Sequence, residues 1–398
     1  MRVAERGRWW VWVAPAVCVV LGVAGWLAGA HLGVDSAVYR AGGAALLHGE
    51  PLYARMSLAA EPDWAGLPFT YPPTAALFFV PMALVPTQVA WGLLGALSLL
   101  ALAVVVKVCV DALPSRPQWM GSWKALAGLG IAFLVLEPVW RSVALGQINL
   151  VLMALVVVDV LVLGARGSRA GGVLVGVAAA VKLTPLVFVG HLLLLKRWAD
   201  AARAVGVFLG LQLLMFLVAR QDVVDYWGSA VQDPDRVGPV YWAGNQSLNG
   251  LVLRLFDGAE WSEVAVAVVA LVLVVPCALL VRRSPALPAL LVSAFFGLLI
   301  SPVSWSHHWV WAVPLLVLLL GRVRSPRDAW APALVAAVFA SCVLIFMRNG
   351  HAQEFVEFEW TPWEYAIGSA YLLVPAVVGL TLLVRAVRAR REPAGAAG

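Results

Sequence analysis

Long apolar runs recur along almost the whole chain, separated by short segments that hold the charged residues, and this feature constrains the fold most. Hydrophobic residues make up 62% of the 398 residues and charged residues only 13%, well below the roughly 25% that is usual in soluble domains. In a membrane, a helix of about 20 apolar residues crosses the bilayer. The sequence therefore predicts an all-α integral membrane protein with many spans.

The apolar runs, bounded by charges or by Pro and Gly clusters, predict twelve membrane spans, several of them shorter than a straight crossing needs. The predicted spans are 9–30, 88–110, 125–140, 148–165, 171–181, 185–199, 204–219, 262–281, 287–300, 306–320, 330–347 and 364–386. We expect one polytopic domain over 1–391 with two large outer loops, 31–87 and about 220–261. A short tail, 392–398, is rich in small residues and is expected to be disordered.

The basic residues predict the orientation of the chain. With the N-terminus inside, 20 of the 28 lysines and arginines fall in segments on the cytoplasmic side, as the positive-inside rule requires. Both termini are then cytoplasmic, and both large loops face outward from the plasma membrane. Counting the proline-rich segment 71–86 as a crossing would invert every later loop, so we expect an amphipathic or re-entrant helix there. The net charge of +6 thus reports orientation and indicates no nucleic-acid partner.

Cysteine and histidine spacing gives no sign of a metal centre. The four cysteines each lie in a different apolar run: Cys18, Cys109, Cys277 and Cys342. This spacing matches neither a disulfide framework nor a metal site, and no clustered zinc-type ligand set occurs. We expect no metal ion and no cofactor.

Asp35 is the strongest candidate for a catalytic residue because it follows directly on the first predicted span. Ionisable groups in or beside a membrane are costly to keep and are functional candidates by default. Asp is also a favoured N-cap residue, so Asp35 could instead cap the short surface helix that we predict after it.

Other unusual polar residues fall on the same predicted side of the membrane. Lys182 stands between two half-length apolar segments, where it could bind an anion or extend toward the membrane surface. His307 and His308 are adjacent, and adjacent helical side chains point about 100° apart, so we expect one of them, His307, to line a site. The remaining candidates are Arg141, Arg254, Gln147, Asn149, Tyr71, Asn245, Gln246 and Trp305.

This set of residue types suits a sugar carried by a lipid phosphate. Amides and carboxylates bind hydroxyl groups, tryptophan rings stack on sugars and lie at headgroup depth, and Lys, Arg and His offset phosphate charge. The amides have an alternative role, because Gln147, Asn149, Asn245 and Gln246 could simply satisfy backbone groups near the interface.

Seven short motifs, taken in order, resemble glycosyltransferase family 87, a family of GT-C-type membrane enzymes. The motifs are D-S-A-V-Y, H-G-E-P-L-Y, L-P-F-T-Y-P-P, G-Q-I-N-L, V-K-L-T-P, N-Q-S-L-N-G and S-P-V-S-W-S-H-H-W. The resemblance covers about 33–320, and the last hundred residues match only as further spans. The family includes actinobacterial polyprenyl-phosphate-mannose-dependent α-(1→2)-mannosyltransferases of phosphatidylinositol mannoside and lipoglycan synthesis.

The resemblance implies inverting transfer of a sugar, on the outer face of the plasma membrane, from a polyprenyl phosphate donor to a lipid-linked glycan, without a metal. It places the family's essential aspartate on Asp35, as general base toward the acceptor hydroxyl. Lys182 and His307, with Arg141 or Arg254, would offset charge on the leaving phosphate.

Three alternatives differ in function. The family also contains arabinofuranosyltransferases that use a polyprenyl phosphate donor, so the sugar stays open. A lipid or glycolipid transporter would predict ionisable residues at the bilayer midplane and repeated halves, and the sequence has no such repeat. A non-catalytic envelope protein is the third. No obligate protein partner is expected.

Overall fold

The computed structural model describes residues 9–233, 236–350, 354–373, 375–377 and 380. Within these ranges the chain is helical and forms no β-strand, apart from an isolated antiparallel bridge between Asn245 and Trp305. The helices are α1 (Val13–Leu27), α2 (Val34–His48), α3 (Pro73–Ala83), α4 (Thr87–Asp111), α5 (Trp123–Phe133), α6 (Glu137–Leu145), α7 (Asn149–Val158), α8 (Val173–Val181), α9 (Val187–Leu194), α10 (Trp198–Val218), α11 (Arg220–Asp225), α12 (Leu248–Leu255), α13 (Ser262–Arg283), α14 (Ala286–Ile300), α15 (Ala312–Leu320), α16 (Trp330–Ala340), α17 (Val343–Phe346) and α18 (Pro362–Gly368). The all-α prediction is confirmed for this part of the chain.

In the part of the chain that the structure describes, three helices are long and apolar enough to cross a membrane: α4, α10 and α13. A fourth crossing results if α5 and α6 are counted as one broken span. Helix α13 has only 11% of its most apolar stretch buried in the protein, so most of its apolar surface is available to lipid. Other predicted spans correspond to shorter apolar helices, among them α1, α14 and the segments Asn149–Leu163, Thr184–Leu194 and Ser306–Leu320. The count of twelve crossings stays a prediction.

Several predicted spans have different bounds in the structure, and two of these differences have a clear physical cause. The run predicted at 125–140 is divided into α5 and α6, with a bend of 73° between them. Pro138, in the first turn of α6, has no N–H to continue the preceding helix, so the chain bends there. Helix α10 begins at Trp198 rather than at 204, because Lys196 adopts a positive φ of 58° that completes a tight turn after α9.

The end of the chain is described only in part. The last predicted span, 364–386, corresponds to α18 and the few helical residues that follow it. The rest of that span and the predicted disordered tail, 392–398, lie outside the described residues.

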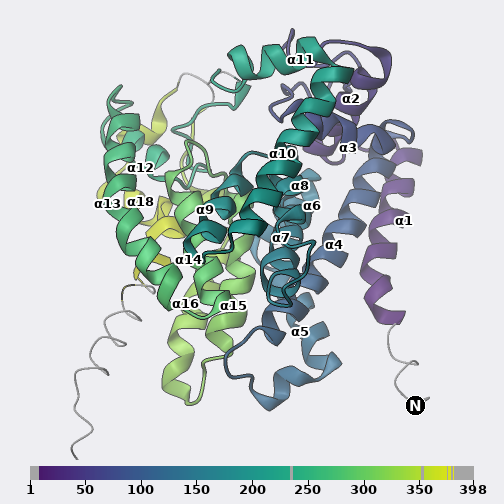
Figure 1. Cartoon of the computed structure of the whole chain (residues 1–398). Helices are drawn as coiled ribbons and strands as arrows, with labels where there is room; N and C mark the ends of the chain where they lie inside the picture. Colours follow the sequence, from purple (N-terminus) through teal and green to yellow (C-terminus); the bar gives the residue numbers. More distant parts are fainter. Residues whose placement is uncertain (1–8, 234–235, 351–353, 374, 378–379, 381–398) are drawn as a thin grey trace, which may run out of the picture.

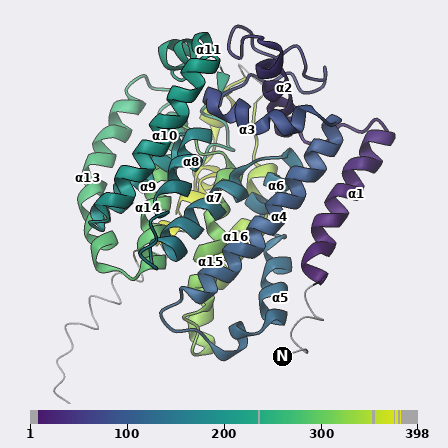
Figure 2. The ribbon, with the colours of Figure 1, turned by 45° about the vertical axis from the view of Figure 1, so that its right-hand side comes forward.

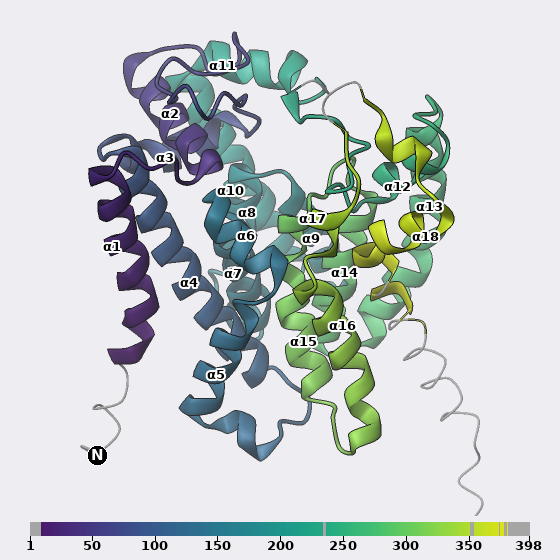
Figure 3. The ribbon, with the colours of Figure 1, turned by 180° about the vertical axis from the view of Figure 1, so that it is seen from behind.

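Helices α2, α3 and α11 gather at one end of the molecule, and α5 lies near the other end (Figures 1 and 2). Seen from behind, α1 and α4 form one edge, while α13 and α18 lie at the opposite edge (Figure 3). Two basic loops meet at the α5 end, because Arg324 after α15 donates to Ser115 Oγ after α4 at 2.6 Å. Helix α2, which carries Asp35, and these two basic loops therefore lie at opposite ends of the bundle.

Glycines bring α2 and its neighbours into backbone contact. A Cβ at Gly43 of α2 would lie 2.5 Å from the carbonyl oxygen of Phe79 in α3, and one at Gly22 of α1 would lie 2.6 Å from that of Gln88 in α4. Distances this short leave room only for glycine, as in the small-residue contacts by which membrane helices associate. The helix that carries Asp35 is thus held closely against α3.

Candidate active site

Asp35 occupies the second position of α2, the helix that follows α1 in the chain. The N-cap of this helix is Gly33, with a φ of 69° and no side-chain cap, and Ser36 Oγ donates to the Gly33 carbonyl at 2.8 Å. Asp35 therefore does not cap α2, and its partly buried carboxylate is available for another use.

The turn between α6 and α7 carries Gln147 to the start of α2. Gly146 in this turn has a φ of 70°, a backbone conformation that glycine adopts without strain. A Cβ at Gly146 would lie 2.4 Å from Ser36 Oγ, so glycine also permits the close approach to α2. This contact accounts for the glycine of the Gly-Gln-Ile-Asn motif.

Gln147 connects Asp35 to two tyrosines. Its side chain is hydrogen-bonded to the Asp35 carboxylate. Its Oε1 lies 2.9 Å from the Tyr39 hydroxyl and 3.1 Å from the Tyr71 hydroxyl, and the two hydroxyl oxygens are 2.6 Å apart. Asp35 thus borders a compact polar network between α2, the turn before α7 and the segment before α3.

Lys182 follows α8 directly, where the backbone becomes extended (φ −147°, ψ 131°). Its Nζ lies 3.0 Å from Asn149 Oδ1 and 3.1 Å from His308 Nε2, and 5.3 Å from the centre of the Tyr71 ring. Because an ammonium group only donates, His308 Nε2 must accept, and the neutral imidazole then carries its proton on Nδ1. These two bonds use two of the three N–H groups of Lys182, and the third can bind a ligand.

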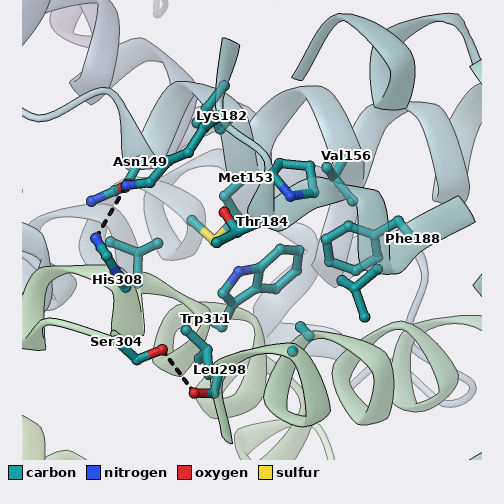
Figure 4. Close-up of a pocket in the computed structure, with 16 residues that line it drawn as sticks. Asn149, Met153, Val156, Lys182, Thr184, Phe188, Leu298, Ser304, His308 and Trp311 are labelled. Carbon is teal, nitrogen blue, oxygen red and sulfur yellow. Dashed lines mark hydrogen bonds between the residues drawn. The ribbon is translucent and has the colours of Figure 1, made fainter. Parts of the chain in front are cut away.

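A cavity of about 60 Å³ lies beside this cluster. Lys182, Asn149 and His308 gather on one side of it, and Phe188 and Val156 lie on the other (Figure 4). Its lining therefore changes from polar to apolar over a short distance.

Of the two adjacent histidines, His308 contacts Lys182 and lines the cavity. The His307 carbonyl accepts hydrogen bonds from Ser142 Oγ at 3.2 Å and from Asn149 Nδ2 at 3.1 Å. The two imidazole planes are nearly perpendicular, at 88°. His308 Nε2 bonds to Lys182, whereas His307 Nε2 is buried without a hydrogen-bond partner among the described residues. We predicted from the sequence that His307 lines a site. In the structure the cavity beside Lys182 is lined by His308.

Burial and charge act against each other on Asp35 and Lys182, which both lie outside the predicted spans. Burial raises the pKa of Asp35 to about 6, although the Gln147 hydrogen bond and the charges of Lys182 and Arg141 lower it. Burial lowers the pKa of Lys182 to about 8, and the Asp35 charge opposes this shift. Near pH 7 the Asp35 carboxylate is therefore ionised and the Lys182 amine protonated, and each charge stabilises the other.

A buried acid that sequence reasoning missed, Glu137, fixes the backbone around the histidines. Its Oε1 accepts from Ser306 Oγ at 2.8 Å and from Arg141 at 3.2 Å, and its Oε2 accepts from the Tyr371 hydroxyl at 2.7 Å. A carboxylate inside an apolar run, directly before Pro138, was the available signal. Arg141 is paired with Glu137. Its positive charge lowers the pKa of Asp35 through electrostatic interaction.

Other sequence candidates make structural contacts away from Lys182. Arg254 is fully buried and donates to the carbonyls of Tyr241, Trp242 and Asn245 at 3.0 to 3.2 Å. The side chain of Asn245 donates to the Val240 and Pro302 carbonyls.

Gln246 donates to the Ala243 and Gly368 carbonyls, and the Trp305 ring packs near Gly244. Asn245 and Gln246 thus satisfy backbone groups, which was one of the two roles expected for the four amides. We propose no ligand role for these two residues or for Arg254.

No three His, Cys, Asp or Glu side chains lie together in a group that could hold a metal ion within the described ranges. Metal-independent activity stays a prediction from the sequence.

Comparisons with known proteins identify relatives along most of the chain. The model of glycosyltransferase family 87 matches residues 69–302. A polyprenol-phosphate-mannose-dependent alpha-(1-2)-phosphatidylinositol mannoside mannosyltransferase of Mycolicibacterium smegmatis is 37% identical over 331 residues, which is 78% of this chain and 74% of that protein. A protein of the same name from Mycobacterium tuberculosis strain H37Rv is 33% identical over 407 residues, or 96% of this chain and 93% of the relative.

A third relative, from M. tuberculosis strain CDC 1551, is named for a phosphatidylinositol pentamannoside acceptor. It is 35% identical over 323 residues, which is 79% of this chain and 74% of that protein. No solved structure matches the chain significantly.

Proposed function

Because this chain belongs to glycosyltransferase family 87, we propose that it transfers mannose from a polyprenyl phosphate donor to a phosphatidylinositol mannoside. Donor and acceptor follow the names of relatives that align over most of the chain. One observation carries the proposal for the site. The Asp35 carboxylate, which forms no ion pair with any described residue, interacts electrostatically with the ammonium group of Lys182, and this ammonium group keeps one N–H for a ligand. The apolar wall beside Lys182 suits a phosphate attached to a hydrocarbon chain.

In the proposed reaction Asp35 is the general base. It takes the proton of the acceptor hydroxyl while that oxygen bonds to the anomeric carbon of the donor sugar. The bond between that carbon and the phosphate oxygen breaks, and its electron pair stays on the phosphate. A single displacement of this kind inverts the anomeric centre and needs one carboxylate. This fits a site in which the other nearby acid, Glu137, is paired with Arg141, Ser306 and Tyr371.

Lys182 and His308 stabilise the leaving phosphate in this proposal. The donor phosphate is a diester with one charge, and the released monoester gains a second charge with a pKa of about 6. An ammonium group in a partly buried site offsets this developing charge more strongly than water would. His308 holds Lys182 in place through Nε2, and its Nδ1–H is a second donor for the phosphate.

We propose that the reaction takes place on the outer face of the plasma membrane. The support comes from charge placement: the basic loops near Ser115 and Arg324 meet at the end of the bundle away from α2. Under the positive-inside rule this end is cytoplasmic, so Asp35 lies on the outer side.

The donor assignment is tested with purified protein in liposomes and three labelled donors: polyprenyl phosphate mannose, polyprenyl phosphate arabinofuranose and GDP-mannose. Labelled phosphatidylinositol mannoside is expected with the first donor alone. Product from the arabinofuranose donor would assign the alternative sugar, and absence of product from all three donors would contradict a transferase role. Acceptors with increasing numbers of mannose residues then give the acceptor preference.

The pH dependence of transfer follows from the two shifted groups. Asp35 acts only when deprotonated, so kcat should rise with pH through about 6, the pKa to which burial raises this carboxyl. Lys182 acts only when protonated, so kcat should fall above about 8, the pKa to which burial lowers it. A bell-shaped profile between these values is expected. A rate that is constant from pH 5 to 7 would contradict the role of Asp35.

A further inference from the structure

The amide of Gln147 meets Asp35 in only one useful orientation. An ionised carboxylate accepts hydrogen bonds and cannot donate them. The Gln147 amide must therefore present its NH2 group to Asp35, which leaves Oε1 on the side of the tyrosines. An amide turned by 180° would place Oε1 against the carboxylate, and two acceptors in contact repel.

Two hydroxyl groups enforce this orientation. Tyr39 and Tyr71 have two hydroxyl hydrogens for three short contacts, to Oε1 at 2.9 and 3.1 Å and to each other at 2.6 Å. Whichever hydroxyl donates to the other, at least one still donates to Oε1. Burial raises the pKa of both tyrosines, so both remain protonated donors over the working pH range.

Rigid packing holds the hydroxyls in position. Tyr39 lies four residues after Asp35 on the same face of α2, is only 1% exposed, and stacks on Phe79 of α3 with ring centres 4.3 Å apart. Tyr71 meets the Tyr39 ring edge-on at 5.1 Å. The network is therefore built into the contact between α2 and α3.

We infer that Gln147 is a positioning residue that orients and stabilises the Asp35 carboxylate. Tyr39 and Tyr71 hold the orientation of the Gln147 amide, and either hydroxyl alone is sufficient for this. The inference rests on the proposed role of Asp35 as the base. Gln147 and Tyr71, which we selected from the sequence as candidates for sugar or phosphate binding, are assigned instead to positioning the base. Tyr39 has the same role and was not selected from the sequence.

The groups that act on Asp35 come from four parts of the fold. Lys182 after α8 and Arg141 on α6 favour its charged form, and Tyr39 on α2 and Tyr71 before α3 lie close enough to interact with it electrostatically. Loss of the Gln147 donor leaves burial opposed by these two cations alone. The charged form of Asp35 then becomes less stable, and a higher pH is needed to produce it.

Replacement of the donor tests the first part of the inference. Gln147→Met keeps the length of the side chain and removes both polar atoms, and Gln147→Glu keeps its shape and removes the donor. The acid limb of the kcat–pH profile should move upward by about one pH unit in Gln147→Met, and further in Gln147→Glu because a second carboxylate is added. The KM for the donor should stay close to the wild-type value.

A double-mutant cycle tests the role of the two tyrosine hydroxyls. Tyr39→Phe and Tyr71→Phe each leave one hydroxyl on Oε1, so each single variant should keep the wild-type acid limb. The double variant should shift it toward that of Gln147→Met, a clearly non-additive result. Tyr365→Phe is the matched control, because it removes a hydroxyl bonded to the Arg254 and Phe358 carbonyls, and it should have no effect on the profile.

An unmoved acid limb in Gln147→Met and Gln147→Glu, or in the double tyrosine variant, would overturn the inference. Equal, additive shifts of the acid limb in the two single tyrosine variants would contradict the claim that either hydroxyl alone holds the Gln147 amide. These results are separable from failure of the proposed function, which would appear as an absence of transfer in the wild type or as full activity of Asp35→Asn.

Discussion

Replacing Asp35 with asparagine should lower the rate of mannose transfer by about 10²–10⁴-fold, the usual contribution of a general base. Asn is nearly isosteric with Asp but cannot take the proton of the acceptor hydroxyl at neutral pH. Folding should be unaffected, because Asp35 does not cap α2 and Gly33 serves as its N-cap. The measurement is the initial rate with labelled polyprenyl phosphate mannose, together with the amount of protein in the membrane.

Asp63→Asn is the matched control for this experiment. Asp63 is exposed, lies in the same segment between α1 and α4 and undergoes the same chemical change, so it should retain wild-type transfer. Wild-type turnover in Asp35→Asn would remove Asp35 from the mechanism. Equal losses in both variants would indicate that a negative charge of the loop, rather than a base, is required.

Lys182→Met should lower kcat over KM for the donor by about 10²–10³-fold, comparable to the loss of one preorganised donor at a developing charge. The phosphate becomes more negative as its bond to the sugar breaks, so the ammonium group contributes more to the transition state than to the bound donor. Both kcat and the KM for the donor should change, and the KM for the acceptor should not.

Lys124→Met is the control for Lys182, because Lys124 is exposed near the start of α5, at the basic end of the bundle. It should have no effect on either KM. If Lys182→Met altered only the acceptor dependence, Lys182 would belong to the acceptor site and the assignment of the donor phosphate would be wrong.

Apart from the start of α10, the long apolar helices could be predicted from the sequence, because hydropathy alone defines them. The runs predicted at 88–110, 262–281 and 287–300 differ by only one or two residues from α4, α13 and α14. The broken segments could not be predicted in the same way. The bend between α5 and α6 depends on Pro138 and on the packing of Glu137 against residues more than 160 positions away.

The candidate site was predicted as a set of residue types and not as a set of contacts. Lys182 stood out because it separates two short apolar segments, but its partners Asn149 and His308 are 33 and 126 residues away. No local pattern encodes such pairings. Arg254 and Asn245 belong to motifs as conspicuous as that of Lys182, and in the structure they bind backbone carbonyls. Tyr39 could have been found, because it lies one helical turn after Asp35.

Donor binding and sugar transfer, measured side by side in Asp35→Asn, test the central claim most directly. Purified variant protein is titrated with labelled polyprenyl phosphate mannose, and product is followed in the same preparation after acceptor is added. The account predicts donor affinity close to that of the wild type with almost no transfer, because Lys182 and His308 still bind the phosphate while the base is missing. Transfer at the wild-type rate, or loss of donor binding together with transfer, would contradict it.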